Sequence, residues 1–423
     1  MAGTGDSPNV LLVTVDCMRR DRISAYGHPN PTTPFLDSLI DGSGLHCTSA
    51  HAAAPWTAPS VASLLSGLYP HNHRAGLLSG EPRNLSRDDL PTKLPDEVPL
   101  LQDMLPGHSA ASFVTVWSAA LPVQGRIGDL RAIAEPASRV AKRALAWMRA
   151  QDGGSFVCWV HLRGGHDPLT VPRDLRVAFG PVDYRRARKW DFTRRDVDLS
   201  TPAFLAYRSE RERLYDAAIL SADASIRVLW EGLGDLRHRT VLVVTADHGE
   251  ELWEHRDEEV ESFADPRGLA GVGHGHSLFQ VLLLVPLVFS GPGIPPGAVE
   301  HSCSLVDVVP TVLEAVGVDA PTMDGVSLLH DQRERPVTAQ GMAYGYEKRA
   351  VVFGDSKLVV SPGDDYERAF RLGEARLEEG PVEDAALLER LRPLLPPDAV
   401  ASGNRVEPTA EIEEHLRGLG YLE

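Results

Sequence analysis

The chain has 423 residues, of which 59 are acidic and 42 basic, so its formal net charge at pH 7 is −17. Hydrophobic residues make up 43% of the chain, which is typical of folded globular proteins and excludes extensive disorder. The acidic excess argues against a nucleic-acid partner and against an anionic membrane surface, because clustered lysine and arginine bind both. An anionic small molecule would need positive charge supplied locally.

The N-terminal segment reaches its first apolar run without a basic region or a small-residue cleavage site, so we expect no secretory signal. The longest apolar run, LFQVLLLVPLVF, is interrupted by Gln280 and Pro286 and falls short of the roughly 20 residues that a membrane helix needs. We therefore predict a cytoplasmic protein. Four scattered cysteines, never at CxxC spacing, favour reduced and packed thiols: these are Cys17, Cys47, Cys158 and Cys303.

Four short apolar runs have the pattern of strands that are covered on both faces: 9–16, 155–162, 240–248 and 285–291. Helical patterns lie between and around them, after Thr57 and over 139–150, 211–233 and 304–318. This alternation predicts an α/β fold, a doubly wound and mostly parallel sheet with helices on both faces.

The pattern changes after about residue 330, where short strands with turns precede a final helical pattern over 411–423. We expect residues 1–331 to form the catalytic domain and residues 332–423 a small C-terminal α+β subdomain. The acidic stretch 256–268 has the composition of a solvated loop, with a lid over the site as the alternative.

Candidate site residues follow the predicted strands, because chemistry in such sheets lies beyond the carboxyl ends of the strands. Asp16 ends the first strand, the segment 161–167 ends the second, and Asp247 and His248 follow the third. Adjacent oxygen and nitrogen ligands suit a divalent cation. A turn or cap role is the alternative for Asp16 taken alone.

Thr57 precedes an apolar helix, so its hydroxyl should lie at a helix N-terminus, where an anionic group is favoured. It is either an ordinary cap or a nucleophile activated by a metal ion. Two histidine loops complete the set of candidates, one with His166 and one with His274 and His276. If they reach the same cleft, they could stabilise charge and protonate a leaving group.

The order and wording of these segments resemble the sulfatase family of the alkaline phosphatase superfamily. The resemblance is carried by residues 9–73, 214–233, 245–255, 273–293, 304–318 and 416–423. It implies the alkaline-phosphatase-like fold and one divalent metal ion held by Asp16, Thr57, Asp247 and His248. It also implies that His166 and either His274 or His276 contact the oxygens and leaving group of the substrate, with His274 closer to the family pattern.

Several positions depart from the family pattern. Where the family has Cys or Ser in CxPxR, this chain has Thr57 with Val61 in place of the arginine, so no formylglycine can form at that position. Cys17 stands where a second aspartate follows the first, and Leu284 replaces the arginine of RVPL. Two carboxylates, a hydroxyl and an imidazole favour Zn²⁺ or Mn²⁺ over Ca²⁺.

The sequence thus predicts a metal-dependent hydrolase or transferase that acts on a phosphate ester or diester through a covalent threonine intermediate. Two alternatives stay open: a sulfatase that works without formylglycine, and an inactive sulfatase-like binding protein. In either enzymatic case the expected substrate is a small-molecule phosphate or sulfate ester.

Overall fold

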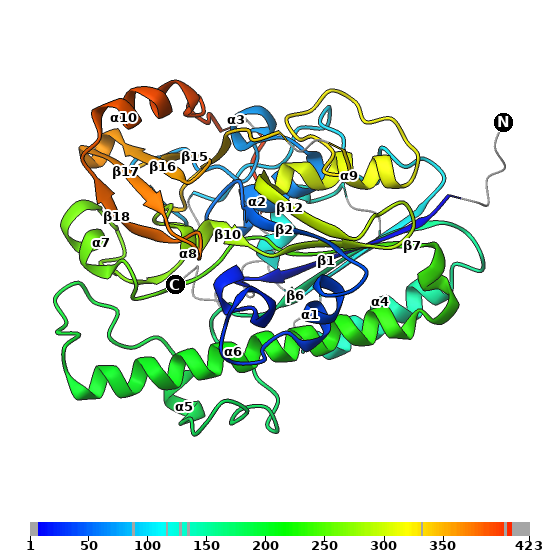
Figure 1. The fold of residues 1–423 in the computed structure, drawn as a ribbon, viewed down its shortest axis with the longest axis horizontal. Coiled ribbons are helices and arrows are strands. Elements are labelled where there is room, and N and C mark those ends of the chain that lie inside the picture. Colours follow the sequence, from blue (N-terminus) through cyan, green and yellow to red (C-terminus); the bar gives the residue numbers. More distant parts are fainter. Residues whose placement is uncertain are drawn as a thin grey trace.

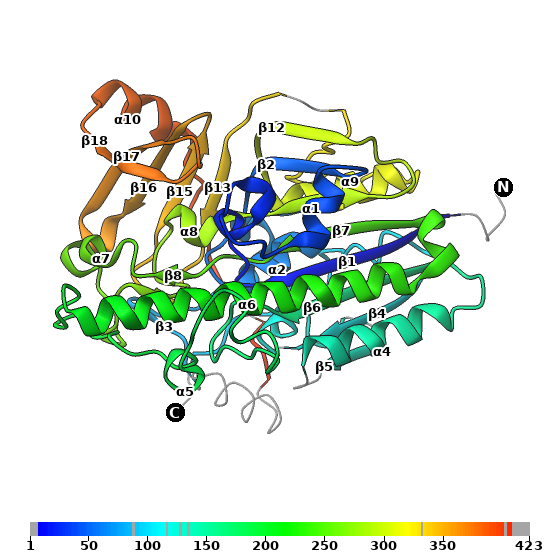
Figure 2. The same cartoon turned by 60° about the horizontal axis from the view of Figure 1, so that its bottom comes forward.

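The computed structural model describes residues 7–407 apart from short gaps at 87–88, 116, 127–128, 133–135, 331–332 and 402–403. The described residues form a large, mostly parallel sheet with helices on both faces (Figures 1 and 2). Helices α4 and α6 run along one face, and α2 and α9 lie on the other. The predicted fold class is confirmed.

The strand order in the nine-stranded sheet is β10-β2-β11-β7-β1-β6-β4-β5, with β12 beside β2. Strands β7, β1, β6, β4 and β5 are parallel to one another, whereas β11 is antiparallel to both of its neighbours. Their bounds are Asn9–Asp16 (β1), Leu45–His51 (β2), Ser109–Val114 (β4), Asp129–Ala132 (β5), Phe156–Arg163 (β6), Thr240–Ala246 (β7), Leu284–Val285 (β10), Leu287–Ser290 (β11) and Gly297–Ser304 (β12).

The helices of the predicted pattern form, with shifted ends. The long helix α6 begins before the predicted 211 because Thr201 caps it: its side chain accepts the N–H of Phe204, and Pro202 occupies the first helical position. The bounds are Pro34–Ile40 (α1), Thr57–Ser66 (α2), Pro70–His73 (α3), Ala137–Arg149 (α4), Tyr184–Ala187 (α5), Pro202–Gly232 (α6), Arg256–Ser262 (α7), Gln280–Leu283 (α8), Val308–Ala315 (α9) and Ala385–Leu391 (α10).

A second, antiparallel sheet forms after residue 336, in the order β13-β15-β16-β17-β18. The boundary predicted between residues 331 and 332 and the closing helix predicted over 411–423 lie outside the described residues, so that division remains a prediction. The remaining strand bounds are Val337–Gln340 (β13), Arg349–Phe353 (β15), Ser356–Ser361 (β16), Tyr366–Leu372 (β17) and Glu378–Val382 (β18), with the short pairs Arg83–Asn84 (β3) and Tyr344–Gly345 (β14), and Glu251–Leu252 (β8) and Val272–Gly273 (β9).

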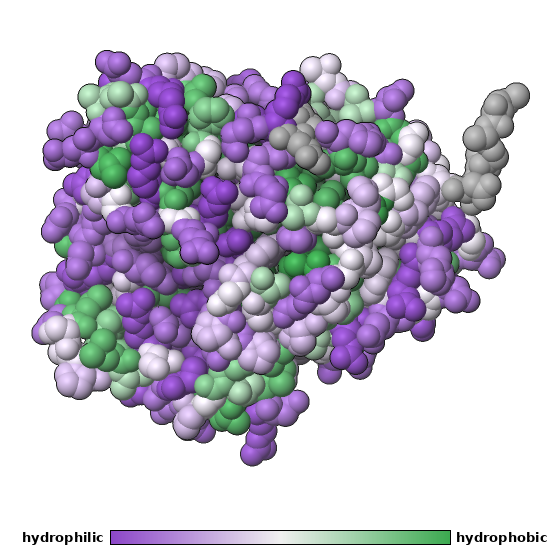
Figure 3. All heavy atoms as spheres, in the orientation of Figure 1, coloured by the Kyte–Doolittle hydropathy of each residue, from purple (hydrophilic) through white to green (hydrophobic). Residues whose placement is uncertain are grey.

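The surface is dominated by hydrophilic residues on the face drawn in Figure 3, where apolar residues lie in small, separate patches. Among the described helices, none combines the length and the apolar composition of a membrane span. All four cysteines are buried and unpaired, as the sequence predicts.

Candidate active site

The carboxyl ends of β1, β6 and β7 meet at one edge of the sheet. Asp16 is the last residue of β1, and Asp247 follows β7 directly. The register places Val15 beside Ala246 and Thr14 beside His161, so the side chains that follow or end these strands converge. Asp16, Asp247, His161 and His248 are all fully buried here.

Thr57 lies close to these strand ends, at the start of α2 on the face of the sheet opposite α4 and α6. It is the first residue of α2, a helix whose ten residues are all buried, and Trp56 precedes it at the N-cap position without a side-chain capping hydrogen bond. The hydroxyl of Ser60 donates to the carbonyl of Asp247 at 2.5 Å, which joins the first turn of α2 to the end of β7. The Oγ1 atom of Thr57 consequently lies 3.2 Å from Nε2 of His248.

The ligand atoms named by the sequence surround His248. Its Nε2 atom is 3.4 Å from Oδ2 of Asp247 and 3.6 Å from Oδ1 of Asp16. Burial opposes the ionisation of Asp16, but the neighbouring imidazoles of His166, His161 and His248 hold its pKa well below the usual value. Burial, with the charge of Asp16 nearby, raises the pKa of Asp247. The same two histidines, His161 and His248, thus favour the ionised forms of both Asp16 and Asp247.

His166 and His274 lie on one side of this cluster. Their ring centroids are 5.0 Å apart, and that of His274 is 4.4 Å from that of His248. Nδ1 of His274 donates to Oε1 of Glu250 at 3.0 Å, and Nδ1 of His166 donates to the Asp167 carbonyl at 2.5 Å. The Nε2 atoms of both rings thus face away from these acceptors. Burial raises the pKa of Glu250 to about 7, against the opposing effect of His166 and His248.

His276, in contrast, makes its hydrogen bond outside this cluster. Its Nε2 atom is 2.8 Å from Oε1 of Glu259, and Asp265 and Arg267 are its other charged neighbours. Glu259 is buried in α7, where it also accepts the N–H of Gly271. The prediction that 256–268 is a solvated loop is wrong for this helix, because Glu259 turns inward to bind the histidine loop.

The residues after β13 hold both site loops in place. The indole Nε1 of Trp56 donates to the carbonyl of Gly341 at 2.7 Å, and the N–H of Ala343 donates to the carbonyl of Gly275 at 2.8 Å. Gly275 has φ +81°, and a Cβ there would lie 2.8 Å from the Cβ of Ala343, so glycine is required between the two histidines. The C-terminal sheet therefore takes part in positioning Thr57 and His274.

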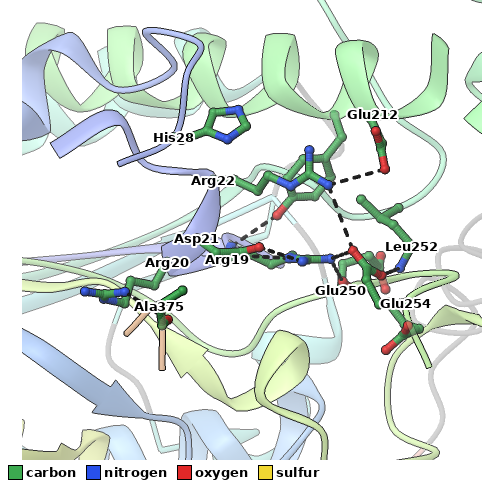
Figure 4. A network of polar contacts seen from close by, with 12 residues as sticks. Arg19, Arg20, Asp21, Arg22, His28, Glu212, Glu250, Leu252, Glu254 and Ala375 are labelled. Atoms are coloured by element: carbon green, nitrogen blue, oxygen red, sulfur yellow. Dashed lines mark hydrogen bonds and ion pairs between the residues drawn. The ribbon is translucent and has the colours of Figure 1, made fainter. Parts of the chain in front are cut away.

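Arg19 joins the loops that follow β1 and β7 (Figure 4). It is only 1% exposed, forms ion pairs of 2.7 Å with Asp21 and with Glu254, and donates to the carbonyl of Glu250 at 3.0 Å. Its backbone N–H donates to the hydroxyl of Tyr215 on α6. This buried guanidinium fixes the chain on both sides of the site.

Replacement of Arg19 by methionine should lower the free energy of unfolding by about 2 kcal/mol, because it removes the charge-assisted hydrogen bonds of this buried guanidinium with the partly exposed carboxylates of Asp21 and Glu254. Urea unfolding followed by circular dichroism measures this loss. Arg194, whose side chain is 77% exposed, provides the matched control, and Arg194→Met should change stability by less than about 0.5 kcal/mol. Equal small effects for both variants would contradict the assigned role of Arg19.

A divalent cation fits the donors at the strand ends. Among the described residues, no hydrogen-bond partner lies within reach of three buried atoms: Oδ2 of Asp16, Oδ2 of Asp247 and Nε2 of His161. Buried polar atoms in native proteins are normally satisfied, so such a group calls for an explanation. Carboxylates, imidazole and hydroxyl are the donor set that Zn²⁺ or Mn²⁺ accepts.

Glu250 and Cys17 of this cluster were given no role from the sequence, and His161 was named there only as part of the candidate segment 161–167. Glu250 lies two positions after His248, His161 lies within β6, and Cys17 follows Asp16. The thiol of Cys17 donates to Oδ1 of Asp16 at 3.3 Å, and burial raises its pKa. The position of His161 near the end of a buried strand was the available signal, whereas Glu250 and Cys17 carried none beyond their proximity to predicted ligands.

The chain is similar to known sulfatases over most of its length. The sulfatase family model matches residues 8–108 and 135–318. A low-salt glycan biosynthesis sulfotransferase of Haloferax volcanii is 30% identical over 335 residues, which are 78% of this chain and 65% of that protein. Arylsulfatase A of Bos taurus is 27% identical over 76% of this chain and 67% of its own length. The chain thus spans about two thirds of the length of these relatives.

Solved structures show the same fold. A phosphonate monoester hydrolase of Agrobacterium radiobacter matches with a TM-score of 0.66 and 18% identity, over 91% of this chain and 93% of that chain. A protein solved in complex with its substrate D-glucosamine-2-N,6-O-disulfate matches with a TM-score of 0.67 and 16% identity, over 98% of both chains. At these identities the likeness concerns the fold alone.

Proposed function

The chain belongs to the sulfatase family, and from this premise we propose that it is a metal-dependent hydrolase or transferase that cleaves a phosphate ester or diester at Thr57. The observation that carries the proposal is the position of the Thr57 hydroxyl. It lies at the N-terminus of α2, 3.2 Å from His248, beside the carboxylates of Asp16 and Asp247. A hydroxyl nucleophile replaces the aldehyde that other family members form at this position.

A divalent cation held by Asp16, Asp247, His248 and Thr57 would lower the pKa of the Thr57 hydroxyl and attract the oxygens of the ester. The Oγ1 atom, after giving up its proton to solvent, would form a bond to phosphorus while the bond from phosphorus to the leaving oxygen breaks and that oxygen takes a proton from a histidine of the site. Water or an acceptor alcohol next attacks the phosphothreonine, which restores the hydroxyl of Thr57. Attack by water makes the protein a hydrolase, and attack by an alcohol makes it a transferase.

His166 and His274 are the groups that would face the ester, with His276 as the alternative for the second role. The carboxylate of Glu250 accepts a hydrogen bond from Nδ1 of His274 and would stabilise the imidazolium form of that ring. His274 is therefore better placed than His276 to protonate the leaving oxygen. Burial and the neighbouring His248 lower the pKa of His274, and the negative charge of a bound ester would oppose that shift. His166 would donate a hydrogen bond to the developing charge on phosphorus oxygens.

Two findings bear on the choice between a phosphate and a sulfate ester. Phosphonate monoester hydrolases share the fold, which supports a phosphorus ester as the substrate. Val61 stands where the family pattern has an arginine, so the charges beside Thr57 differ from those expected of a sulfatase. The sulfotransferase and arylsulfatase relatives favour a sulfate ester as the second candidate. A cytoplasmic location stays part of the proposal, supported by four unpaired cysteines.

Parallel assays with p-nitrophenyl phosphate, bis(p-nitrophenyl) phosphate and p-nitrophenyl sulfate, each with Mn²⁺ and Zn²⁺, test the proposal. We expect a phosphorus ester to be cleaved with the highest kcat/KM, and quenched reactions to contain a peptide with phosphate on Thr57 by mass spectrometry. Preference for the sulfate would establish the second candidate. Absence of turnover on all three esters, together with absence of metal binding, would support an inactive binding protein instead.

A further inference from the structure

His161 occupies a buried position at the edge of the candidate metal site. It lies in β6 opposite Thr14 of β1 and is fully buried. Its Nε2 atom is 3.7 Å from Oδ2 of Asp16, which is too long for a hydrogen bond. Within the described part of the chain, neither of these two atoms has a hydrogen-bond partner. The spacing between these two potential ligand atoms is compatible with a metal ion that binds both.

The other ring nitrogen of His161 is already engaged. Nδ1 lies 2.7 Å from the hydroxyl oxygen of Thr14, and the indole Nε1 of Trp159 donates to the same oxygen at 3.0 Å. A hydroxyl oxygen has two acceptor lone pairs, so it can accept both N–H groups. Metal binding at Nε2 requires this arrangement, with the proton of His161 on Nδ1 and the lone pair on Nε2. Histidine ligands of metal ions are held in this way by a partner on the opposite nitrogen.

The three atoms without partners lie close enough to bind one ion. The ligand atoms of Asp16, His161 and Asp247 all lie within 4.8 Å of one another. Two ligands of one tetrahedral Zn²⁺ ion, each bonded at roughly 2.0 to 2.2 Å, lie about 3.4 Å apart. The 3.7 Å between Nε2 of His161 and Oδ2 of Asp16 is close to that spacing, and the ligand atoms would draw together on binding the ion.

A second trio of potential ligands, Cys17, His248 and His274, does not meet the same test. The Nδ1 atom of His248 donates to the carbonyl of Gly249 at 2.8 Å, and that of His274 donates to Glu250. The Nδ1 atoms of both rings are protonated donors in this arrangement, so His248 could bind a metal ion only through Nε2, which faces Asp16 and Asp247. Cys17 also donates to Asp16, so it does not replace the aspartate that the family resemblance leads one to expect there.

We propose that Nε2 of His161 is a direct ligand of the metal ion, which gives this chain a site with two imidazoles, from His161 and His248, beside Asp16, Asp247 and Thr57. The inference rests on the proposed metal dependence and deepens it. The second imidazole replaces a carboxylate ligand, so the site carries less negative charge and favours Zn²⁺ or Mn²⁺ over Ca²⁺.

X-ray absorption spectroscopy at the zinc edge, on the full chain loaded with one equivalent of Zn²⁺ alone, counts the imidazole ligands without any substrate. We expect two imidazoles in the wild type, and one in either His161→Gln or His248→Gln. Competition with a chelator should show that His161→Gln weakens Zn²⁺ binding by about 100-fold or more, above the range of changes that affect only supporting residues. His73, which is fully buried and contacts Ser63, provides the matched control, and His73→Gln should keep both imidazoles and the affinity.

A single imidazole in the wild type, retained in His161→Gln, would overturn the proposal and leave His161 as a support for Asp16. A wild-type count of one imidazole overturns the proposal even if a variant fails to fold. This result is separate from the proposed function, because a site with one imidazole could still cleave phosphate esters, and a site with two could fail to cleave them.

Discussion

Thr57→Ala is expected to lower kcat for the preferred phosphate ester by about 1000-fold or more, because it removes the nucleophile while the rest of the site stays in place. Thr57 is the first residue of a fully buried helix whose sequence is otherwise unchanged, so the variant should fold. Steady-state kinetics and phosphate analysis of the quenched enzyme measure the loss of turnover and of the covalent intermediate together.

Thr57→Ser is the matched control, since it keeps a hydroxyl at the same position. It should retain turnover within about tenfold of the wild type and should form a phosphoserine at residue 57. If Thr57→Ala instead cleaves the ester at a rate close to that of the wild type, Thr57 is not the nucleophile. In that case water activated at the same site would have to attack the ester directly.

Asp247→Asn should abolish stable binding of the metal ion, with an affinity lower by about 100-fold or more and a corresponding loss of activity. The carboxylate is fully buried, its Oδ2 atom lies 3.4 Å from Nε2 of His248, and an amide is a much weaker ligand. Metal analysis after dialysis measures occupancy directly. Asp223→Asn is the control, because Asp223 is also buried but accepts the N–H groups of Phe35 and Leu36 at the start of α1.

The stability of the metal-free protein separates ligand loss from unfolding. Asp16 and Asp247 place two carboxylates in one buried cluster, so removal of one charge should raise the melting temperature of the metal-free form. The wild type should regain the difference when Zn²⁺ or Mn²⁺ is added, and Asp247→Asn should not. Full metal occupancy in Asp247→Asn would contradict the assignment of this residue as a ligand.

The strands of the sheet centre were predictable because they are buried on both faces. The runs that contain β1, β6 and β7 are nearly continuous in apolar residues, and the structure places all three side by side. Strands β2 and β12 were missed, since their sequences LHCTSAH and GAVEHSCS mix polar residues with small ones. These two strands lie toward one edge of the sheet and pair with each other. Their hydrogen bonds to neighbouring strands, and not a run of apolar residues, define them as strands.

The sequence by itself determined the fold class, the family and the positions of Asp16, Thr57, Asp247 and His248, because strand ends and a helix start carry recognisable patterns. The sequence also named His166 and preferred His274 to His276, whereas only the tertiary structure showed which of these rings lie together and that His161 lies beside them. His166 and His274 meet beside His248, His276 is bound to Glu259, and His161 enters the cluster through its register with β1. The reason is physical: a histidine has the same composition and spacing in the chain whether its ring faces a metal site or a buried carboxylate, and only packing between distant segments sets that direction.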